Sequence, residues 1–94
     1  MRIRWTRRAA QNLDEIFDYV TREYPAHAPA IMARLLESIE KLADAPGLGR
    51  PGRIAGTREL VIRKYPYIVP YRVQGDEVHI LRVFHARQKP PETW

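Results

Sequence analysis

The chain has 94 residues, of which 45% are hydrophobic and 29% charged, so we expect one folded domain and exclude a disordered chain. Residues 1–5 contain no apolar run, so no leader peptide is expected. The sequence has no stretch near the roughly 20 apolar residues that span a bilayer, and no cysteine for a disulfide or thiolate metal site. Sixteen Lys and Arg against 11 Asp and Glu leave a net charge of +5, which indicates either an acidic partner or a simple solubility charge. A cytoplasmic location is expected.

The N-terminal segment predicts a short strand followed by a helix. Residues 1–5 alternate apolar and basic side chains, which is typical of a strand with one buried face. Thr6 can cap a helix, and apolar residues then recur every three or four positions over about 7–24. Pro25 disfavours helical geometry in the residue before it, so the helix is expected to end there.

A second apolar stripe at helical spacing predicts another helix over about 26–44, with a start that Pro29 could delay. Since the link between the two helices is short, they are expected to form an antiparallel hairpin. The stretch 45–56 contains four glycines and two prolines and is interpreted as a loop.

The C-terminal half changes to segments rich in Val, Ile, Tyr and Leu. These predict strands over about 57–64, 67–74 and 78–85, joined by turns and forming an antiparallel meander. Pro70 interrupts the middle strand because it cannot donate a ladder hydrogen bond, so we expect a bulge or local break there. The order β-α-α-β-β-β predicts a single two-layer α+β domain over 1–94, in which the first strand joins the C-terminal sheet.

The C-terminal half also carries an ordered series of motifs. It has Arg-Glu-Leu at 58–60, Tyr-Pro-Tyr at 65–67, Ile-Val-Pro-Tyr-Arg at 68–72 and Ile-Leu-Arg-Val at 80–83, closing on His85. This series resembles the ParE-type toxins of the ParE/RelE superfamily, including the proline inside the middle strand. The N-terminal half agrees in layout, so the resemblance covers nearly the whole chain.

The resemblance implies a two-helix hairpin packed on a twisted, mainly antiparallel four-stranded sheet. It also implies the toxin of a type II toxin–antitoxin system, without a cofactor, which causes growth arrest or plasmid stabilisation. The expected partner is a cognate antitoxin with an acidic tail and its own DNA-binding domain, in a heterotetramer or larger complex. RelE-like members cleave mRNA, usually on the ribosome, whereas ParE-like members inhibit DNA gyrase, so the alternative to a gyrase inhibitor is a ribosome-dependent or free mRNA endoribonuclease.

The two activities require different residues. A metal-independent endoribonuclease needs an acid, a base and cations for the phosphate. Candidates for that work are Arg63, Arg82, His85 and Arg87. His85 suits acid–base chemistry by its residue type, or it simply packs at a strand end. Where the RelE pattern has a phosphate-binding arginine after the first tyrosine of the middle strand, this chain has Ile68 after Tyr67. Since isoleucine cannot stabilise a phosphorane, gyrase inhibition is favoured over mRNA cleavage.

Two binding surfaces are expected. The basic tail 86–94 contains a stiff Pro-Pro step and ends on Trp94, which is either an anchor for a partner or part of a frayed terminus. The expected target-binding residues are His85, Arg87, Gln88, Lys89 and Trp94. An acidic antitoxin segment is expected in the groove between the helices and the sheet, at Leu13, Phe17, Tyr24, Ile31 and Leu35. The histidines lack metal-ligand spacing, so no metal site is expected.

Overall fold

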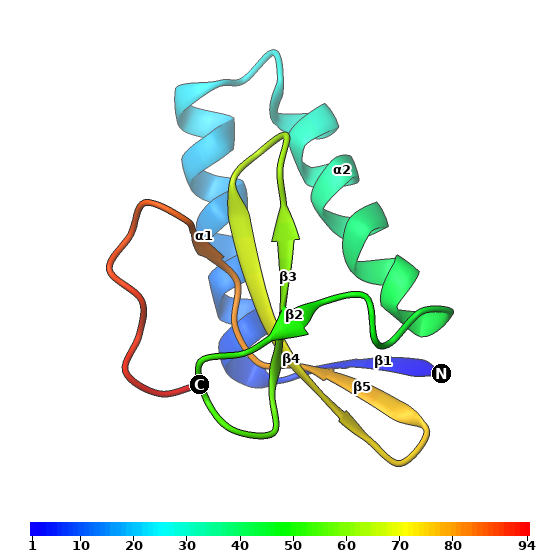
Figure 1. Cartoon of the computed structure of the whole chain (residues 1–94). Coiled ribbons are helices and arrows are strands. Elements are labelled where there is room, and N and C mark those ends of the chain that lie inside the picture. The colour runs from blue at the N-terminus through cyan, green and yellow to red at the C-terminus, as the bar shows by residue number, and fades with distance from the viewer.

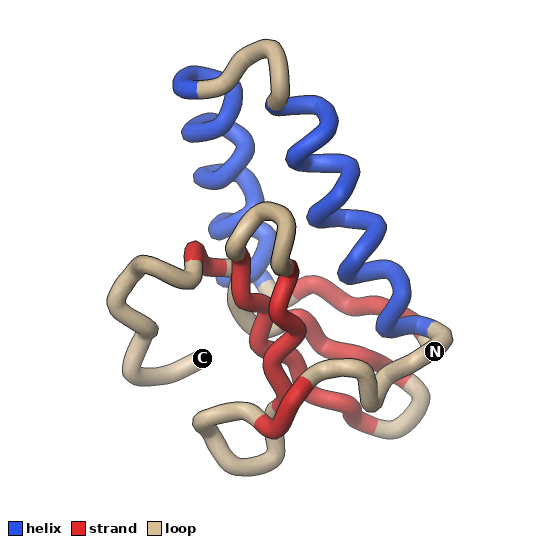
Figure 2. Tube along the Cα trace, turned by 45° about the horizontal axis from the view of Figure 1, so that its top comes forward, coloured by secondary structure: helices blue, strands red, loops and turns tan.

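The computed structural model describes residues 1–94 and has two layers, a helix hairpin and a sheet (Figure 1). In Figure 2 the two blue helices run side by side, and the red strands gather to one side of them. The elements in chain order are β1 (Arg2–Trp5), α1 (Arg7–Glu23), α2 (Ala28–Glu40), the short 3₁₀ helix η1 (Lys41–Ala43), β2 (Arg50–Pro51), β3 (Arg58–Ile62), β4 (Tyr67–Gln74), β5 (Glu77–Ile80) and β6 (Phe84–His85). The α+β class and the helix hairpin predicted from the sequence are confirmed.

The sheet has the strand order β1-β5-β4-β3-β2, and β6 pairs with β4 as well. Strand β1 runs parallel to β5, with Ile3 opposite Val78, and all other pairs are antiparallel. The expected four strands become six for two reasons. The predicted loop 45–56 contributes the two-residue β2, and the predicted strand 78–85 is divided into β5 and β6.

Thr6 fixes the start of α1 against the sheet. Its Oγ1 accepts a hydrogen bond from the main-chain N–H of Ala9 at 3.1 Å and donates to the carbonyl oxygen of Ile80 at 2.8 Å. The predicted N-cap is therefore confirmed, and it also ties the helix to the end of β5. The helix then ends at Glu23, one residue before the predicted end.

The second helix is shorter than predicted. Residues before Ala28 form a turn in which the N–H of His27 donates to the carbonyl of Tyr24 at 2.9 Å, so Pro29 falls in the first turn of α2, where its missing N–H is tolerated. The last predicted turn is the 3₁₀ helix η1. Neither helix has the length and apolar character needed to cross a bilayer.

The break predicted at Pro70 occurs in the partner strand rather than in β4. Tyr71 pairs with Ile80, while Ile68 pairs with Phe84, so the intervening partner segment holds one extra residue and forms a bulge. The Pro70 carbonyl accepts from the N–H of Leu81 at 2.9 Å, and Pro70 itself has no N–H to donate to the same neighbour. The bulge ends β5 and starts β6, and so sets the position of His85.

The Tyr71 side chain holds the loop before β2 in place from inside the core. Its side chain is completely buried, and its hydroxyl accepts from the N–H of Gly49 at 2.8 Å and donates to the carbonyl of Pro46 at 2.7 Å. A Cβ atom on Gly49 would lie 2.7 Å from the Tyr71 ring and 2.9 Å from the main-chain oxygen of Glu59. Only glycine fits this approach without displacing buried atoms.

We expect Gly49→Ala to lower the free energy of unfolding by about 2 kcal/mol, because the added methyl group overpacks the Tyr71 contact. Urea denaturation followed by circular dichroism measures the change. Gly47→Ala is the matched control, since a Cβ there meets nothing within 4 Å. Equal stability of the two variants would contradict the prediction.

Candidate functional site

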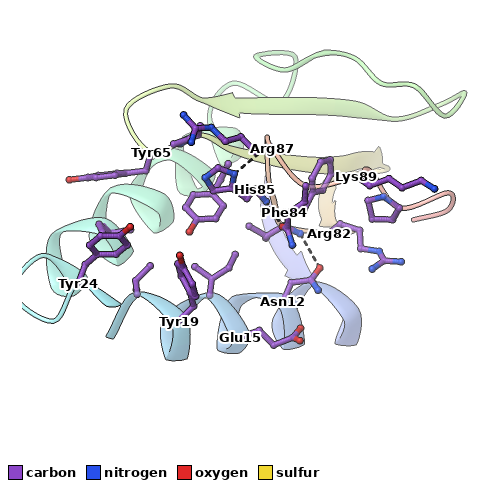
Figure 3. A pocket seen from close by; sticks show the side chains of 18 of the residues that line it. Asn12, Glu15, Tyr19, Tyr24, Tyr65, Arg82, Phe84, His85, Arg87 and Lys89 are labelled. Carbon is purple, nitrogen blue, oxygen red and sulfur yellow. Dashed lines mark hydrogen bonds between the residues drawn. The ribbon is translucent and has the colours of Figure 1, made fainter. Parts of the chain in front are cut away.

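An open cleft of about 1220 Å³ lies between α1 and the C-terminal end of the chain (Figure 3). One wall comes from α1 and the residues after it, and the other from the β3–β4 turn, β6 and the tail. The residues that line the cleft include Asn12, Glu15, Tyr19, Tyr24, Ile31, Tyr65, Tyr67, Arg82, Phe84, His85, Arg87, Gln88, Lys89 and Pro91. Segments from both ends of the sequence thus form one site.

Tyrosines make the cleft partly aromatic. Tyr19 and Tyr24 meet edge to face with ring centroids 6.3 Å apart, and Tyr67 lies edge-on to the His85 ring at 5.4 Å. Burial raises the pKa of Tyr67, while the nearby Tyr24 and then burial raise the pKa of Tyr19. Their hydroxyls therefore stay protonated at neutral pH and are available as hydrogen-bond donors.

The first turn of the tail fixes the orientation of His85. Its Nδ1 accepts from the main-chain N–H of Arg87 at 3.1 Å, so the proton of the neutral ring belongs on Nε2. The main-chain N–H of His85 donates to Oε1 of Gln88 at 2.8 Å, and its carbonyl accepts from the Gln88 N–H at 2.9 Å. These bonds satisfy the outer edge of β6 and leave Nε2–H as a free donor.

Asn12 connects α1 to the bulge. Its Oδ1 accepts from the N–H of Val83 at 3.1 Å, which leaves the amide NH₂ group as a further donor (Figure 3). Arg82 donates from Nη2 to the main-chain oxygen of Thr93 at 3.2 Å, while its buried Nε has no partner. Burial, followed by repulsion from Arg8, lowers the pKa of Arg82, and no carboxylate lies within 4 Å of its guanidinium.

Donors and cations outnumber acceptors in the cleft. Glu15 supplies its single carboxylate, whereas Arg82, Arg87 and Lys89 carry positive charge. No group of three or more His, Asp or Glu side chains is arranged to hold a metal ion. The arrangement suits an acidic ligand with apolar or aromatic parts.

The predicted antitoxin-binding residues separate into three groups. Tyr24 and Ile31 line the cleft, although Ile31 is nearly buried. Phe17 is 51% exposed outside the cleft, and Leu13 packs against the core. Leu35 is 0% exposed, so the expectation that it lies on a contact surface is corrected. It points from α2 into the core, because the apolar stripe of that helix faces the sheet.

The nuclease candidates are brought together only in part. Arg82, His85 and Arg87 line the cleft, but Arg63 lies exposed in the turn after β3, outside it. Of the expected target-binding residues, Gln88 and Lys89 line the tail side of the cleft. The bulge between Ile80 and Phe84 lies between Arg82 and His85 in the chain, and the sequence alone does not show it.

Trp94 does not extend into solvent but packs on the sheet. Its ring stacks on Phe84 with centroids 5.9 Å apart, and its Nε1 donates to Oγ1 of Thr57 at 3.3 Å. The Arg53 guanidinium lies 5.7 Å from the centroid of each ring. Ile68, which pairs with Phe84 across the strands, is only 7% exposed. This sheet face beside β6 is thus closed.

Asn12, Glu15, Tyr19 and Tyr65 were not predicted as site residues. Asn12 and Tyr19 lie three or four positions from Ile16 on the apolar stripe of α1, and polar groups on such a stripe were the available signal. Tyr65 belongs to the Tyr-Pro-Tyr turn, whose position over α1 depends on the β3–β4 pairing. Glu15 carried no local signal.

Comparison with known proteins agrees with this geometry. A family model described as the ParE toxin of the type II toxin–antitoxin system, parDE, matches residues 3–90. The protein Y4kP of Sinorhizobium fredii is 50% identical over 91 residues, covering 97% of this chain and 94% of the relative. Toxin RelE2 of Caulobacter vibrioides is 39% identical over 82 residues, covering 87% of this chain and 91% of the relative.

A solved structure of a chromosomal ParDE toxin–antitoxin system from P. aeruginosa superposes with a TM-score of 0.81 at 34% identity, covering 90% of this chain and 95% of that chain. The chain therefore belongs to the ParE toxin family of type II toxin–antitoxin systems, within the ParE/RelE superfamily.

Proposed function

We propose that this toxin acts by inhibiting DNA gyrase, and that an antitoxin neutralises it by inserting an acidic segment into the cleft. The observation that carries the choice of target is the closed sheet face beside β6. Trp94 and Arg53 pack on Phe84, and Ile68, its partner across the strands, is only 7% exposed. Ile68 stands where the RelE pattern has a phosphate-binding arginine. A gyrase inhibitor needs only a binding surface, and a gyrase target implies action in the cytosol.

The charges on this face argue in the same direction. RNA cleavage requires cations that can approach the phosphate as negative charge develops. Arg53 is held by Glu59 at 3.0 Å, which offsets its charge in part because Arg50 shares the same carboxylate, and Ile68 contributes no charge. Phosphate binding there would require the tail to leave and the Arg53–Glu59 pair to open.

One observation favours the alternative, a metal-independent endoribonuclease of RelE type. Arg82, His85 and Arg87 line the same cleft, and His85 presents a free Nε2 donor. Against this, Arg82 already donates to the Thr93 main-chain oxygen, and its guanidinium is partly buried. The two activities are separated by experiment below.

The antitoxin proposal rests on the chemistry of the cleft. Its walls carry three cations and several donors but one carboxylate, and Tyr19 and Tyr24 offer exposed aromatic surface beside them. An acidic segment that folds on binding would match the charges and cover Arg87 and Lys89. Because the tail is also the proposed target-binding surface, filling the cleft would block the target.

We expect the purified chain to inhibit supercoiling by purified gyrase and to leave a defined mRNA intact. His85→Ala should change the inhibitory concentration by no more than about tenfold, because a binding contact is lost and no chemistry, whereas losing a general acid or base costs about 10²–10⁴-fold. The supercoiling assay is run beside mapping of RNA ends.

His79→Ala is the matched control, since this second strand histidine lies outside the cleft and pairs with Glu77. New RNA ends that disappear in His85→Ala, together with unaffected supercoiling, would overturn the gyrase proposal and establish the nuclease.

A further inference from the structure

We infer that Trp94 is a positioning residue whose docking holds one wall of the cleft in place for its ligand. This wall, here called the tail wall, consists of Arg87, Gln88, Lys89 and Pro91. The inference rests on the proposed function of the cleft as the site of an acidic antitoxin segment. Trp94 itself does not line the cleft, so its role would be indirect.

The tail is attached only at its two ends. At the first end, the hydrogen bonds between His85 and the Arg87–Gln88 turn hold it to β6. At the second end, Thr93 and Trp94 return to the body of the protein, as the red segment of Figure 1 shows. Residues 89–92 between them form no hydrogen bond or ion pair. The course of the tail wall therefore depends on the second end.

That second end contacts four separate parts of the chain. The indole ring stacks on Phe84 of β6, and its N–H donates to Thr57, which precedes β3. Arg8 of α1 donates to the main-chain oxygen of Trp94 at 2.6 Å. Arg82 of the bulge donates to the main-chain oxygen of Thr93 at 3.2 Å. A frayed terminus would not gather contacts from both layers.

Arg53 strengthens the docking of Trp94, and Glu59 in turn holds Arg53 in place. Its guanidinium lies 5.7 Å from the centroids of both Phe84 and Trp94, a cation–π arrangement with two rings. Glu59 fixes that guanidinium with bonds of 3.0 and 3.1 Å to Nε and Nη2. A buried carboxylate thus supports the cation on which the Trp94 ring rests.

A ligand in the cleft contacts α1 on one side and the tail wall on the other. With Trp94 docked, Arg87 and Lys89 are already positioned, and binding does not have to order them. With Trp94 released, the ligand must order several tail residues, and this entropy cost lowers affinity. Docking of Trp94 therefore favours ligand binding, and ligand binding favours docking of Trp94.

The test measures binding of the purified antitoxin encoded beside this toxin gene to the full-length chain. Trp94→Ala should raise the dissociation constant at least tenfold, with an unchanged circular dichroism spectrum and faster tryptic cleavage after Arg87, because the tail beyond it is no longer held at its second end. Trp94→Phe should stay within about threefold of wild type, because an aromatic ring for Phe84 and Arg53 remains, while the indole N–H and part of the ring area are lost. A purely structural role would not produce this rescue together with the faster cleavage confined to the tail.

Wild-type affinity of Trp94→Ala for the antitoxin would overturn the inference. If Trp94→Ala does not fold, Trp94→Leu replaces it, and equal affinity of the Leu and Phe variants overturns the inference instead. Tyr19→Ala, on the opposite wall, distinguishes the two proposals. If Tyr19→Ala weakens binding and Trp94→Ala does not, the cleft remains the site and only the positioning role fails. If neither does, the cleft proposal fails.

Discussion

Leu35→Ala is expected to lower the free energy of unfolding by about 3–5 kcal/mol. The side chain is 0% exposed and packs in the core with Ile39 and Leu42 below the sheet residues Val69 and Tyr71. Truncation leaves a cavity that neighbouring side chains of two layers cannot fill without moving the helix. Urea denaturation at constant m-value measures the loss.

A loss of this size is severe for a domain of 94 residues, whose total stability is expected at about 5–10 kcal/mol. The matched control is Phe17→Ala, which removes a larger apolar side chain that is 51% exposed. That variant should change stability by less than about 1 kcal/mol. If Leu35→Ala kept wild-type stability and lost only antitoxin affinity, Leu35 would belong to a contact surface after all.

Glu59→Gln is expected to lower the free energy of unfolding at pH 7 by about 3 kcal/mol. The Glu59 side chain is 2% exposed and accepts bonds from the Arg53 side chain, the Arg53 main chain at 2.9 Å and Arg50 at 3.0 Å. Burial alone would raise the pKa of this carboxyl, but the hydrogen bonds from Arg53 and then Arg50 outweigh it and lower the pKa to about 2. Glutamine keeps the shape and loses the charge that both arginines match.

The same group makes stability depend on pH with a definite sign. Its pKa is about 2 in the folded chain and near its ordinary value of 4.5 in the unfolded chain, so the unfolded state takes up the proton first as pH falls. The stabilisation is complete above pH 4.5 and is lost progressively down to about pH 2. Wild type and Glu59→Gln should therefore converge in stability across this window.

Denaturant midpoints collected from pH 7 to pH 2 measure the convergence. Glu40→Gln serves as the control, because Glu40 is exposed at the end of α2 and forms no ion pair. A constant difference between wild type and Glu59→Gln at every pH would show that the Gln variant fails for reasons of packing rather than charge.

Periodicity predicted both helices and the main strands because each buries one continuous face. The alternation in residues 1–5 and the helical stripe after Thr6 are local patterns, and the structure places β1 and α1 within a residue of them. The C-terminal strands were located for the same reason. Their ends were less accurate, since the division between β5 and β6 depends on the bulge that lies opposite Pro70 of β4.

Site residues were harder to predict than elements. Arg82, His85 and Arg87 were candidates by residue type, and the cleft contains them all. Arg63 was an equally basic candidate, but it lies in the turn after β3, outside the cleft. Leu35 was assigned to a contact surface because a helical stripe alone does not show which of its members remain covered.

The amino-acid order alone determined the α+β class, the helix hairpin, the toxin family and the positive charge, because these depend on local periodicity, composition and a contiguous motif. Only the tertiary structure decided which side chains meet. Asn12 and Val83, or Arg8 and Trp94, come together because β1 inserts beside β5 and the tail returns to the sheet. Contacts between distant segments depend on the register and on the bulge, and neither is encoded in any short window of sequence.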